Sequence, residues 1–305
     1  MKAIVTGGNG FIGSHIVDRL IQKSWEVIVI DDNSAECNDK FYYNNKAKNY
    51  KINICDYDLI YPLFEGVDVV FHLAAESRIQ PAILNPCYTT KVNVVGTCNI
   101  LQAARESDVD RVIYSSTSSG YGRKNKPPLR EDMLKDCLNP YSVAKCAGED
   151  LCSMYTSLFG LKTVSFRYFN VYGERQPTRG QYAPVVGLFL KQYAEGKPMT
   201  IVGDGTQRRD FTNIYDAVEA NILAAETENQ SVFGQVFNVG TGTNFSILDI
   251  VNKIDGECEN IAPRIGESKV TLADNSKIKN ILGWKPKIEF MNWLQEELKK
   301  EKYKK

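Results

Sequence analysis

Runs of apolar, mostly β-branched residues recur through the first half of the chain. They fall at residues 2–5, 26–30, 50–54, 68–73, 111–114 and 163–166. A short apolar run without alternating polar positions is typical of a strand that is buried on both faces, as the strands of a parallel sheet are. We therefore expect these runs to be the strands of one buried, parallel sheet.

Amphipathic helical patterns separate the apolar runs. Ile12, Ile16 and Leu20 recur at intervals of four residues, so they lie on one face of a predicted helix. Residues 92–104 carry a similar apolar stripe, and Arg105 follows it with a charge that suits the last turn of a helix. One apolar face per helix indicates that each helix covers a sheet and leaves its other face in water.

The longest predicted helix has clear signals at both ends. Asn139 is a favoured N-cap, Pro140 suits the first helical position, and Gly160 is typical of the residue that ends a helix. Alternating strands and helices of this kind connect through right-handed crossovers. The pattern predicts an α/β fold in which a doubly wound parallel sheet of the Rossmann type carries helices on both faces.

The pattern changes after Phe166, where turn-forming residues break the chain into shorter elements. These turns lie at Tyr172-Gly173, Gln176-Pro177, Arg179-Gly180 and Gly203-Asp204-Gly205-Thr206. A chain of 305 residues is long enough for about two domains. We expect a larger domain over residues 1–169 and a smaller α/β domain over residues 170–305, with a strand near residues 236–239 that returns to the first sheet.

Composition narrows the classes of function. The 37 basic and 37 acidic residues give a formal net charge of zero, which disfavours a nucleic-acid partner. No run reaches 18 apolar residues, so we expect no transmembrane helix and no membrane partner. The first residues become glycine-rich too early for a signal peptide, and we therefore expect a cytoplasmic protein.

Cysteine and histidine positions do not fit a metal site. The 8 cysteines form no C-x-x-C pair, and the two histidines, His15 and His72, add no zinc-like spacing. No Ser and His pair carries the signature of a catalytic triad. We therefore expect reduced thiols and no metal, with the chemistry supplied by a cofactor or by Tyr, Lys and carboxylate side chains.

The first predicted strand leads into the loop Thr6-Gly7-Gly8-Asn9-Gly10-Phe11-Ile12-Gly13 and then into a helix. Glycines let such a loop turn tightly and approach a pyrophosphate, which the free N–H groups at the start of the helix can bind. Asp31 ends the next strand, 18 residues after Gly13, where a carboxylate accepts hydrogen bonds from a ribose diol. Because that carboxylate would repel a 2′-phosphate, the sequence favours NAD over NADP.

Tyr141 and Lys145 lie four residues apart on the longest predicted helix and so project from one face. A cation roughly 6 Å from a phenol is worth about 3 kcal/mol, or about two pKa units, at an effective dielectric constant of about 20. Lys145 and an oxidised nicotinamide would together bring the pKa of Tyr141 towards neutrality. The hydroxyl-rich segment 115–122 follows a strand, at the sheet edge where ligands bind in this fold class.

These features together resemble the extended short-chain dehydrogenase/reductase superfamily. Within its NAD-dependent epimerase/dehydratase family, the chain is most similar to the UDP-hexose 4-epimerases, over essentially its whole length. The resemblance rests on the glycine loop, on Asp31 and on the ordered motifs His72-Leu73-Ala74-Ala75, Asn93 to Thr97, Ser115-Ser116-Thr117, Tyr141-Ser142-x-x-Lys145, Arg167-Tyr168-Phe169-Asn170, Gly203 to Phe211 and Leu282-Gly283-Trp284-x-Pro286.

The resemblance implies a role for each matching residue. Tyr141 would be the catalytic base, Lys145 would hold the nicotinamide ribose, and Thr117 would hydrogen-bond the sugar O4. The first domain would bind NAD through Gly7, Gly10, Phe11, Ile12, Gly13, Asp31, Asp32, Asn33, Asn53, Ile54, Leu73, Ala74, Ala75, Asn93, Ser115, Tyr141, Lys145 and Tyr168. A UDP-sugar would be bound, mainly by the smaller domain, through Ser77, Thr117, Asn170, Arg209, Arg264, Glu267 and Thr271, with the two arginines on its diphosphate.

The sequence departs from the family pattern at several positions. Asn53 stands where the family usually has an aspartate that accepts from adenine, and its amide carbonyl can take that role. Ser77 replaces a lysine found in some epimerases, which removes one phosphate contact. Ser118-Ser119 stands where 4,6-dehydratases carry Asp-Glu, so elimination of water is disfavoured. Thr271 falls at the position that gates the sugar pocket, and its small size admits N-acetylated hexoses beside glucose and galactose.

The resemblance thus implies an NAD-dependent 4-epimerase of UDP-hexoses that acts through a transient 4-keto sugar. Alternatives within the family are a sugar-nucleotide dehydratase or decarboxylase and a UDP-uronate 4-epimerase. From another class, a non-catalytic NAD-binding sensor would share the fold, although such proteins tend to lose the Tyr or the Lys. The family usually forms homodimers through two helices, which here would be those that contain Asn93 and Tyr141.

Overall fold

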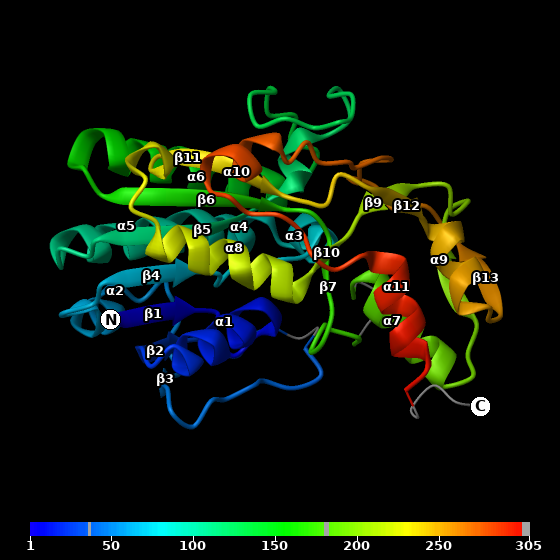
Figure 1. Ribbon diagram of the computed structural model, residues 1–305, viewed down its shortest axis with the longest axis horizontal. Helices are drawn as coiled ribbons and strands as arrows, with labels where there is room; N and C mark the ends of the chain where they lie inside the picture. Colours follow the sequence, from blue (N-terminus) through cyan, green and yellow to red (C-terminus); the bar gives the residue numbers. More distant parts are fainter. Residues whose placement is uncertain (36–37, 180–182, 301–305) are drawn as a thin grey trace.

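A seven-stranded sheet forms the centre of the larger part of the molecule (Figure 1). The computed structural model describes residues 1–35, 38–179 and 183–300. The strands of the sheet are β1 (Lys2–Thr6), β2 (Glu26–Ile30), β3 (Lys48–Tyr50), β4 (Val69–His72), β5 (Arg111–Thr117), β6 (Lys162–Tyr168) and β11 (Gln235–Val239). They run parallel in the order β11-β6-β5-β4-β1-β2-β3, which confirms the predicted doubly wound sheet of the Rossmann type.

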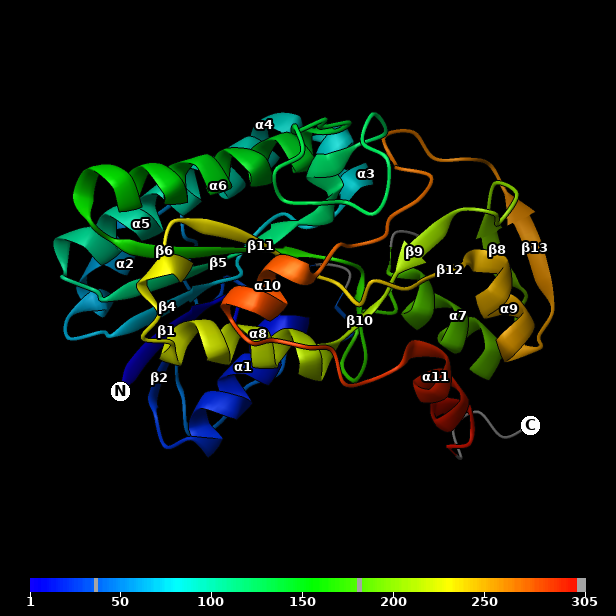
Figure 2. The same ribbon diagram turned by 45° about the horizontal axis from the view of Figure 1, so that its top comes forward.

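Helices cover both faces of this sheet, as Figure 2 shows. One face packs against α1 (Phe11–Gln22), α8 (Ile214–Glu226) and α10 (Ser276–Ile281), whose apolar residues share a core with β1, β4 and β6. The other face packs against α5 (Thr97–Glu106) and α6 (Pro140–Phe159), together with α2 (Tyr57–Ile60) and η1 (Tyr61–Phe64). Within the described ranges, no helix has the length and apolar character that crossing a membrane requires.

Short helical elements occupy several of the connections. They are α3 (Ile79–Leu84), α4 (Pro86–Thr90), the π-helix η2 (Lys91–Gly96) and the 3-10 turns η3 (Ser118–Tyr121) and η4 (Gln230–Val232). The helix predicted over residues 92–104 therefore begins as a wider π-helical turn before it continues as α5. A Cβ atom on Gly96 would lie 2.6 Å from Cδ1 of Ile54, so this turn packs directly on the chain that follows β3.

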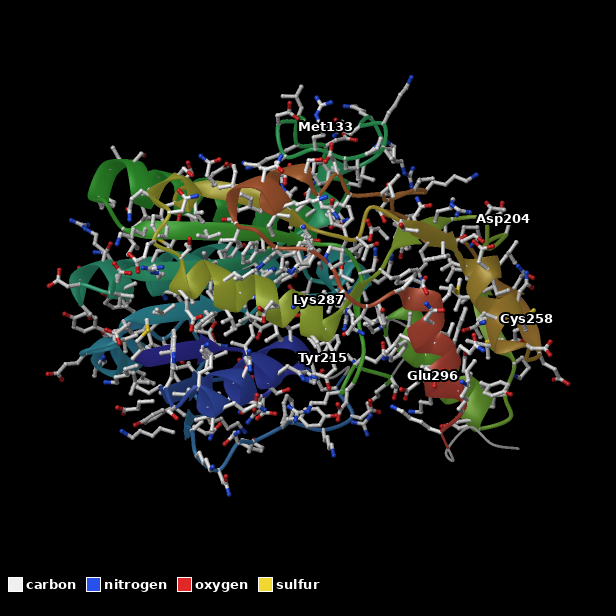
Figure 3. The ribbon with its side chains drawn as sticks, viewed as in Figure 1. Met133, Asp204, Tyr215, Cys258, Lys287 and Glu296 are labelled. Carbon is white, nitrogen blue, oxygen red and sulfur yellow. The ribbon has the colours of Figure 1, made fainter. Side chains whose placement is uncertain are left out.

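A smaller unit lies beside the carboxyl ends of the sheet strands (Figure 1). It contains α7 (Val185–Ala194), β8 (Met199–Val202), β9 (Arg208–Asp210), β12 (Asn244–Ser246), α9 (Ile247–Ile254), β13 (Cys258–Ile261) and α11 (Phe290–Leu298). A separate core that includes Phe189, Ile250 and Leu294 holds it together. Figure 3 shows Asp204 and Cys258 on this unit, and Met133 on the excursion between β5 and α6.

The chain passes between the two units several times. The short parallel pair β7 (Val171–Tyr172) and β10 (Thr212–Asn213) lies between β6 and α8 in the chain. After β10 the chain returns to the larger unit as α8 and β11, and Phe237 of β11 lies opposite Phe166 of β6. It then forms β12, α9 and β13, returns as α10 and ends in α11. The larger unit thus takes a strand and two helices from the chain beyond residue 170.

The boundaries predicted for the longest helix are confirmed. The side-chain oxygen of Asn139 accepts a hydrogen bond from the Ser142 N–H at 2.8 Å, which caps the first turn of α6. Pro140 is the first helical residue, and Gly160 ends the helix in a left-handed conformation with φ of 73°. The caps at both ends of this helix are therefore those that the sequence pattern predicts.

The strand predicted over residues 50–54 is wrong in position. β3 ends at Tyr50 and is a short, exposed edge strand. The side-chain oxygen of Asn53 accepts a hydrogen bond from the Cys55 N–H at 2.9 Å, and this turn takes the chain away from the sheet. Ile54 is buried as its apolar character predicts, but it packs against the π-helix instead of a neighbouring strand.

Candidate active site

A cavity of about 450 Å³ lies at the carboxyl ends of the sheet strands, and residues of both units line it. Most residues expected to bind NAD or a UDP-sugar are among them. They are Gly7, Gly10, Phe11, Ile12, Gly13, Asp31, Asp32, Asn53, Ile54, Leu73, Ala74, Ala75, Ser77, Ser115, Thr117, Tyr141, Lys145, Tyr168, Asn170, Arg209, Arg264, Glu267 and Thr271. Asn33 and Asn93 are not lining residues.

The glycine loop lies at one end of the cavity and is tightly packed. Gly7 has φ of +67°, and a Cβ atom on it would lie 2.8 Å from the backbone nitrogen of Ala74. A Cβ atom on Gly13 would lie 2.1 Å from the carbonyl oxygen of Gly7. Gly10 starts α1 without a side-chain cap, so the first N–H groups of this helix are available to an anion in the cavity.

Asp31 links the glycine loop to the end of β2. Its carboxylate accepts hydrogen bonds from the backbone N–H groups of Asn9 and Asn33, each at 2.9 Å. Burial raises the pKa of Asp31, and these two hydrogen bonds oppose that rise. A carboxylate has about four acceptor positions, so the Asp31 side chain keeps acceptors for the hydroxyl groups of a ribose. Asn33 thus helps to hold Asp31 in place, and its contact with the cofactor stays a prediction.

The Asn53 side chain makes hydrogen bonds within the protein on both sides of its amide. Its amide nitrogen donates to Asp32 at 2.7 Å, and its carbonyl oxygen already accepts from the Cys55 N–H. Only one lone pair of that carbonyl remains for an adenine amino group. Tyr88, whose ring also lines this part of the cavity, forms a side-chain hydrogen bond with Asn53.

Asn93 acts from behind the cavity wall. It lies in η2, is 1% exposed, and its side chain both accepts from the Glu76 N–H at 2.8 Å and donates to the Glu76 carbonyl at 2.9 Å. Glu76 lines the cavity immediately after Ala74 and Ala75. Asn93 therefore fixes the main chain that follows β4, and does not itself face the cavity.

The Thr117 side chain lies close enough to the Tyr141 hydroxyl to lower its pKa by hydrogen bonding. Tyr141 comes from the first turn of α6 and Thr117 from the end of β5. Burial raises the pKa of Tyr141, while the Thr117 hydrogen bond and the positive charge of Arg78 oppose that rise. Arg78 is a lining residue that the motifs did not predict, and the only signal for it was its position next to Ser77.

Lys145 is buried one helical turn after Tyr141. Its Nζ lies 4.2 Å from the centre of the Tyr114 ring, a cation–π contact that β5 supplies. Burial lowers the pKa of Lys145 to about 7. Thr117 and Arg78 are thus the groups that favour the Tyr141 phenolate in the protein itself, while Lys145 lies over a neighbouring ring.

Ser115 and Tyr168 form the wall between β5 and β6. The Ser115 hydroxyl donates to the Tyr168 hydroxyl at 3.4 Å, and the Asn221 amide of α8 donates to the same oxygen at 2.7 Å. Burial raises the pKa of Tyr168, and both hydrogen bonds oppose that rise. Tyr168 therefore presents a fixed, uncharged hydroxyl to the cavity.

The other side of the cavity carries the residues expected to bind a sugar nucleotide. The Arg209 guanidinium is 3.6 Å from the Glu267 carboxylate, and burial lowers the pKa of Arg209 while Glu267 opposes that shift. Arg264 also lines the cavity, so two arginines lie on this side of it. Paired guanidinium groups suit a diphosphate because each offers several donors in a fixed plane.

Asn170 and Thr271 are fixed by hydrogen bonds within the smaller unit. The Asn170 amide donates to the carbonyl of Asp210 at 2.8 Å. The Thr271 hydroxyl accepts from the Asp210 N–H at 3.3 Å, and the Thr271 side chain is 7% exposed. Ser77 lies across the cavity and is exposed. Within the residues that the structure describes, no cluster of His, Cys, Asp and Glu could hold a metal ion.

Comparison with known proteins gives consistent matches. Residues 3–240 match the family model of the NAD dependent epimerase/dehydratase family. A UDP-glucose 4-epimerase of Mycolicibacterium smegmatis is 36% identical over 305 residues, which cover 94% of each chain.

Solved structures with the same fold include complexes. The UDP-glucose 4-epimerase of Thermotoga maritima with UDP-glucose is 34% identical, with a TM-score of 0.90 over 97% of this chain and 96% of that one. The UDP-glucuronic acid 4-epimerase of Bacillus cereus, in complex with UDP-glucuronic acid and NAD, is 33% identical, with a TM-score of 0.87 over 97% of each chain.

Proposed function

The chain belongs to the NAD-dependent epimerase/dehydratase family, and on that premise we propose that it is a 4-epimerase of UDP-hexoses. The observation that carries the proposal is the composition of one cavity. Tyr141 and Thr117 line it from the larger unit, and Arg209 and Arg264 line it from the other side. A base and a pair of arginines in one cavity suit a sugar that reacts while its diphosphate stays bound.

The residues at the other end of the cavity fit NAD. The start of α1 at Gly10 has no side-chain cap and so offers N–H donors to a pyrophosphate. Asp31 offers acceptors to a ribose. NAD bound there would supply a reversible hydride acceptor for the sugar C4, and return of the hydride to the other face of the keto sugar would leave no net redox change.

Tyr141 and Thr117 act on the proton of the sugar 4-hydroxyl. We assign Tyr141 as the base that removes this proton and returns it, and Thr117 as the hydroxyl that hydrogen-bonds the sugar O4 and stabilises the phenolate. Lys145 holds the nicotinamide ribose from the second turn of α6. Arg78 adds a positive charge near the phenol, which favours the ionised base.

Residues of the smaller unit bind the substrate. We assign Arg209 and Arg264 to the diphosphate, with Asn170 beside them, and Glu267 to the uridine ribose. The 4-keto sugar can then turn about its diphosphate linkage without leaving the protein. The larger domain, residues 1–169 with the returning strand near 236–239, would carry NAD, and residues 170–305 would carry the sugar nucleotide.

The experiment that tests this function is NMR of the purified protein with UDP-glucose and no added reductant. We expect UDP-galactose to appear, and UDP-N-acetylglucosamine and UDP-glucuronic acid tested in parallel would define the preferred sugar. Tyr141→Phe should lower the rate about 10²- to 10⁴-fold, because it removes the base but keeps the ring. Tyr61→Phe, at a partly exposed ring of η1 outside the cavity lining, is the matched control.

Other products would identify the alternatives. Loss of water or carbon dioxide would assign a dehydratase or a decarboxylase, and Ser118-Ser119 in the cavity wall provides no acid and base pair for the former. No change in any UDP-sugar would favour a non-catalytic NAD-binding sensor. Full activity of Tyr141→Phe would contradict the assigned base.

We further propose that the protein is a cytoplasmic homodimer. The described cysteines are free thiols, which suits a reducing compartment. Val95 of η2 and Val143 of α6 are 50% and 56% exposed on two elements that contact each other, and burial against a second copy would cover them. Light scattering should give the mass of a dimer, and Val143→Asp should shift it towards the monomer.

A further inference from the structure

Residues 262–268, which we call the strap, connect β13 to the segment that leads into α10. Figure 2 shows this segment crossing from the smaller unit towards α3 before it reaches α10. The strap carries Arg264 and Glu267, two of the residues that line the cavity. Its position therefore determines where these two side chains meet a ligand.

Three side chains of the larger unit hold three consecutive carbonyl groups of the strap. Gln80 of α3 donates to the Ile265 carbonyl at 3.0 Å, and Asn139 donates to the Gly266 carbonyl at 2.9 Å. Arg123 donates to the Glu267 carbonyl twice, from Nε at 3.0 Å and from Nη2 at 2.7 Å. The strap is thus held through its main chain.

Gly266 makes this contact possible. It has φ of +76°, and a Cβ atom on it would lie 3.4 Å from Cβ of Asn139 and 3.5 Å from the carbonyl oxygen of Leu138. A side chain at this position would be strained by the backbone, and its Cβ atom would touch the residues that begin α6 at ordinary contact distance. The strap therefore rests directly on the start of the helix that carries Tyr141.

Asn139 uses both ends of its amide. Its oxygen accepts from the Ser142 N–H at 2.8 Å and caps α6, while its nitrogen donates to the strap. The side chain is 6% exposed, so neither hydrogen bond is readily replaced by water. Any shift of the strap must move this amide or break one of its two hydrogen bonds.

From this geometry we propose that Asn139 is a positioning residue that couples the substrate-binding strap to the catalytic helix. The inference rests on the proposed function, since it assigns a UDP-sugar to Arg264 and the reacting base to Tyr141. A diphosphate bound by Arg264 holds the strap against Gln80, Asn139 and Arg123. The N-cap of α6 and the bound substrate then stabilise each other, so a substrate in place also fixes the first turn of α6.

The test is the affinity for UDP, measured by calorimetry on the protein with its NAD. Asn139→Asp keeps the shape and the capping oxygen but has no N–H group to donate when ionised. We expect it to raise the Kd for UDP about three- to tenfold, the effect of one hydrogen bond, and to raise KM more than it lowers kcat. Gln80→Ala, which leaves α6 unchanged, should also raise the Kd for UDP.

A matched control exists on the far side of the fold. Asn229 caps η4 through its oxygen and donates through its nitrogen to the Ile281 carbonyl at 3.1 Å. Asn229→Asp makes the same chemical change in the same kind of contact, away from the cavity. We expect it to leave the Kd for UDP unchanged and, because Asn229 is exposed whereas Asn139 is buried, to lower the melting temperature less than Asn139→Asp does.

Coupling through the strap also predicts non-additivity. In an Arg264→Ala background, Asn139→Asp should raise the Kd for UDP by a smaller factor than it does alone, because the strap then holds the ligand through Glu267 only. An unchanged Kd in Asn139→Asp, or an effect fully additive with Arg264→Ala, would overturn the proposal. A protein that binds UDP with this pattern but converts no UDP-hexose would overturn only the proposed function, and one that does not bind UDP would overturn both.

Discussion

Arg167 holds Glu149 with two parallel hydrogen bonds in a site that excludes water. Nε donates to Oε1 at 2.9 Å and Nη2 to Oε2 at 2.8 Å, and the two side chains are only 4% and 2% exposed. The Ser116 hydroxyl donates to the same carboxylate at 2.6 Å. Glu149 lies on α6 with Tyr141, and Ser116 precedes Thr117, so this pair joins the elements that carry the base and its hydroxyl partner.

Removal of one partner should destabilise the protein strongly. Glu149→Ala would leave Arg167 charged and buried without its carboxylate, and we expect the free energy of unfolding to fall by about 3–5 kcal/mol. Urea unfolding measures this change. The control is Glu226→Ala, which breaks an exposed pair with Lys23 and should cost less than about 1 kcal/mol. Similar losses in the two variants would contradict the importance of the buried pair.

The same pair predicts how stability depends on pH. Burial by itself would raise the pKa of Glu149, but the hydrogen bonds and charge of Arg167 hold it below its usual value of 4.5. The stabilisation is therefore fully present above pH 4.5 and is lost as the pH falls through the lower folded-state pKa. Urea midpoints measured from pH 6 to pH 3 should fall more steeply for the unaltered protein than for Glu149→Gln.

Thr117→Ala should shift the pH dependence of catalysis. The hydrogen bond from Thr117 lowers the pKa of Tyr141, so its loss raises that pKa. Because the phenolate is the active form, the rising limb of kcat against pH should move to higher pH, and kcat at neutral pH should fall about 10- to 100-fold. Thr117→Ser keeps the hydroxyl and should keep the limb in place. An unshifted limb in Thr117→Ala would contradict the assigned hydrogen bond.

Lys145 should titrate near neutrality in the NAD-free protein. Burial lowers its pKa to about 7, so between pH 7 and its usual 10.5 the folded chain holds this amine neutral while the unfolded chain binds a proton. Lys145 therefore makes the protein more stable as the pH rises through this window. Carbamylation by cyanate, followed peptide by peptide, should show a midpoint near pH 7 at Lys145. A midpoint near 10 would contradict the effect of burial.

Asp31→Asn should weaken the binding of NAD and change the preference of the protein between NAD and NADP. The variant loses a charged acceptor for the ribose hydroxyls, which is worth about 1.5–3 kcal/mol, or about 10- to 100-fold in Kd. It also removes the charge that repels a 2′-phosphate, so the preference for NAD over NADP should shrink. Calorimetry with both dinucleotides tests this, with the exposed Asp58→Asn as control. An unchanged ratio of the two affinities would argue against Asp31 as the ribose ligand.

Features set by local chemistry could be predicted from the sequence. Asn139, Pro140 and Gly160 delimit a helix because capping and left-handed backbone depend on adjacent residues. The glycine loop followed by Asp31 was recognisable for the same reason, since strand, turn and helix are contiguous there. The pairing of Tyr141 with Lys145 on one helix followed from helical spacing alone.

Features that depend on distant chain segments could not be predicted. The hydrogen bonds onto the strap end on main-chain carbonyls, which every residue carries, so no side-chain pattern marks their acceptors. Glu149 lies four residues after Lys145 on the same helix face, but its partner Arg167 arrives from another strand. The strand predicted at residues 50–54 failed because Ile54 is buried against the π-helix, and apolarity alone does not distinguish that environment from a sheet.

Two units that the chain connects at several points do not share a single hinge. The chain crosses between the units from β6 to β7, from β10 to α8, from β11 to β12, from the strap to α10 and from α10 to α11. A ligand in the cavity therefore meets side chains that the same chain brings there on separate passes, from segments that are distant in the sequence.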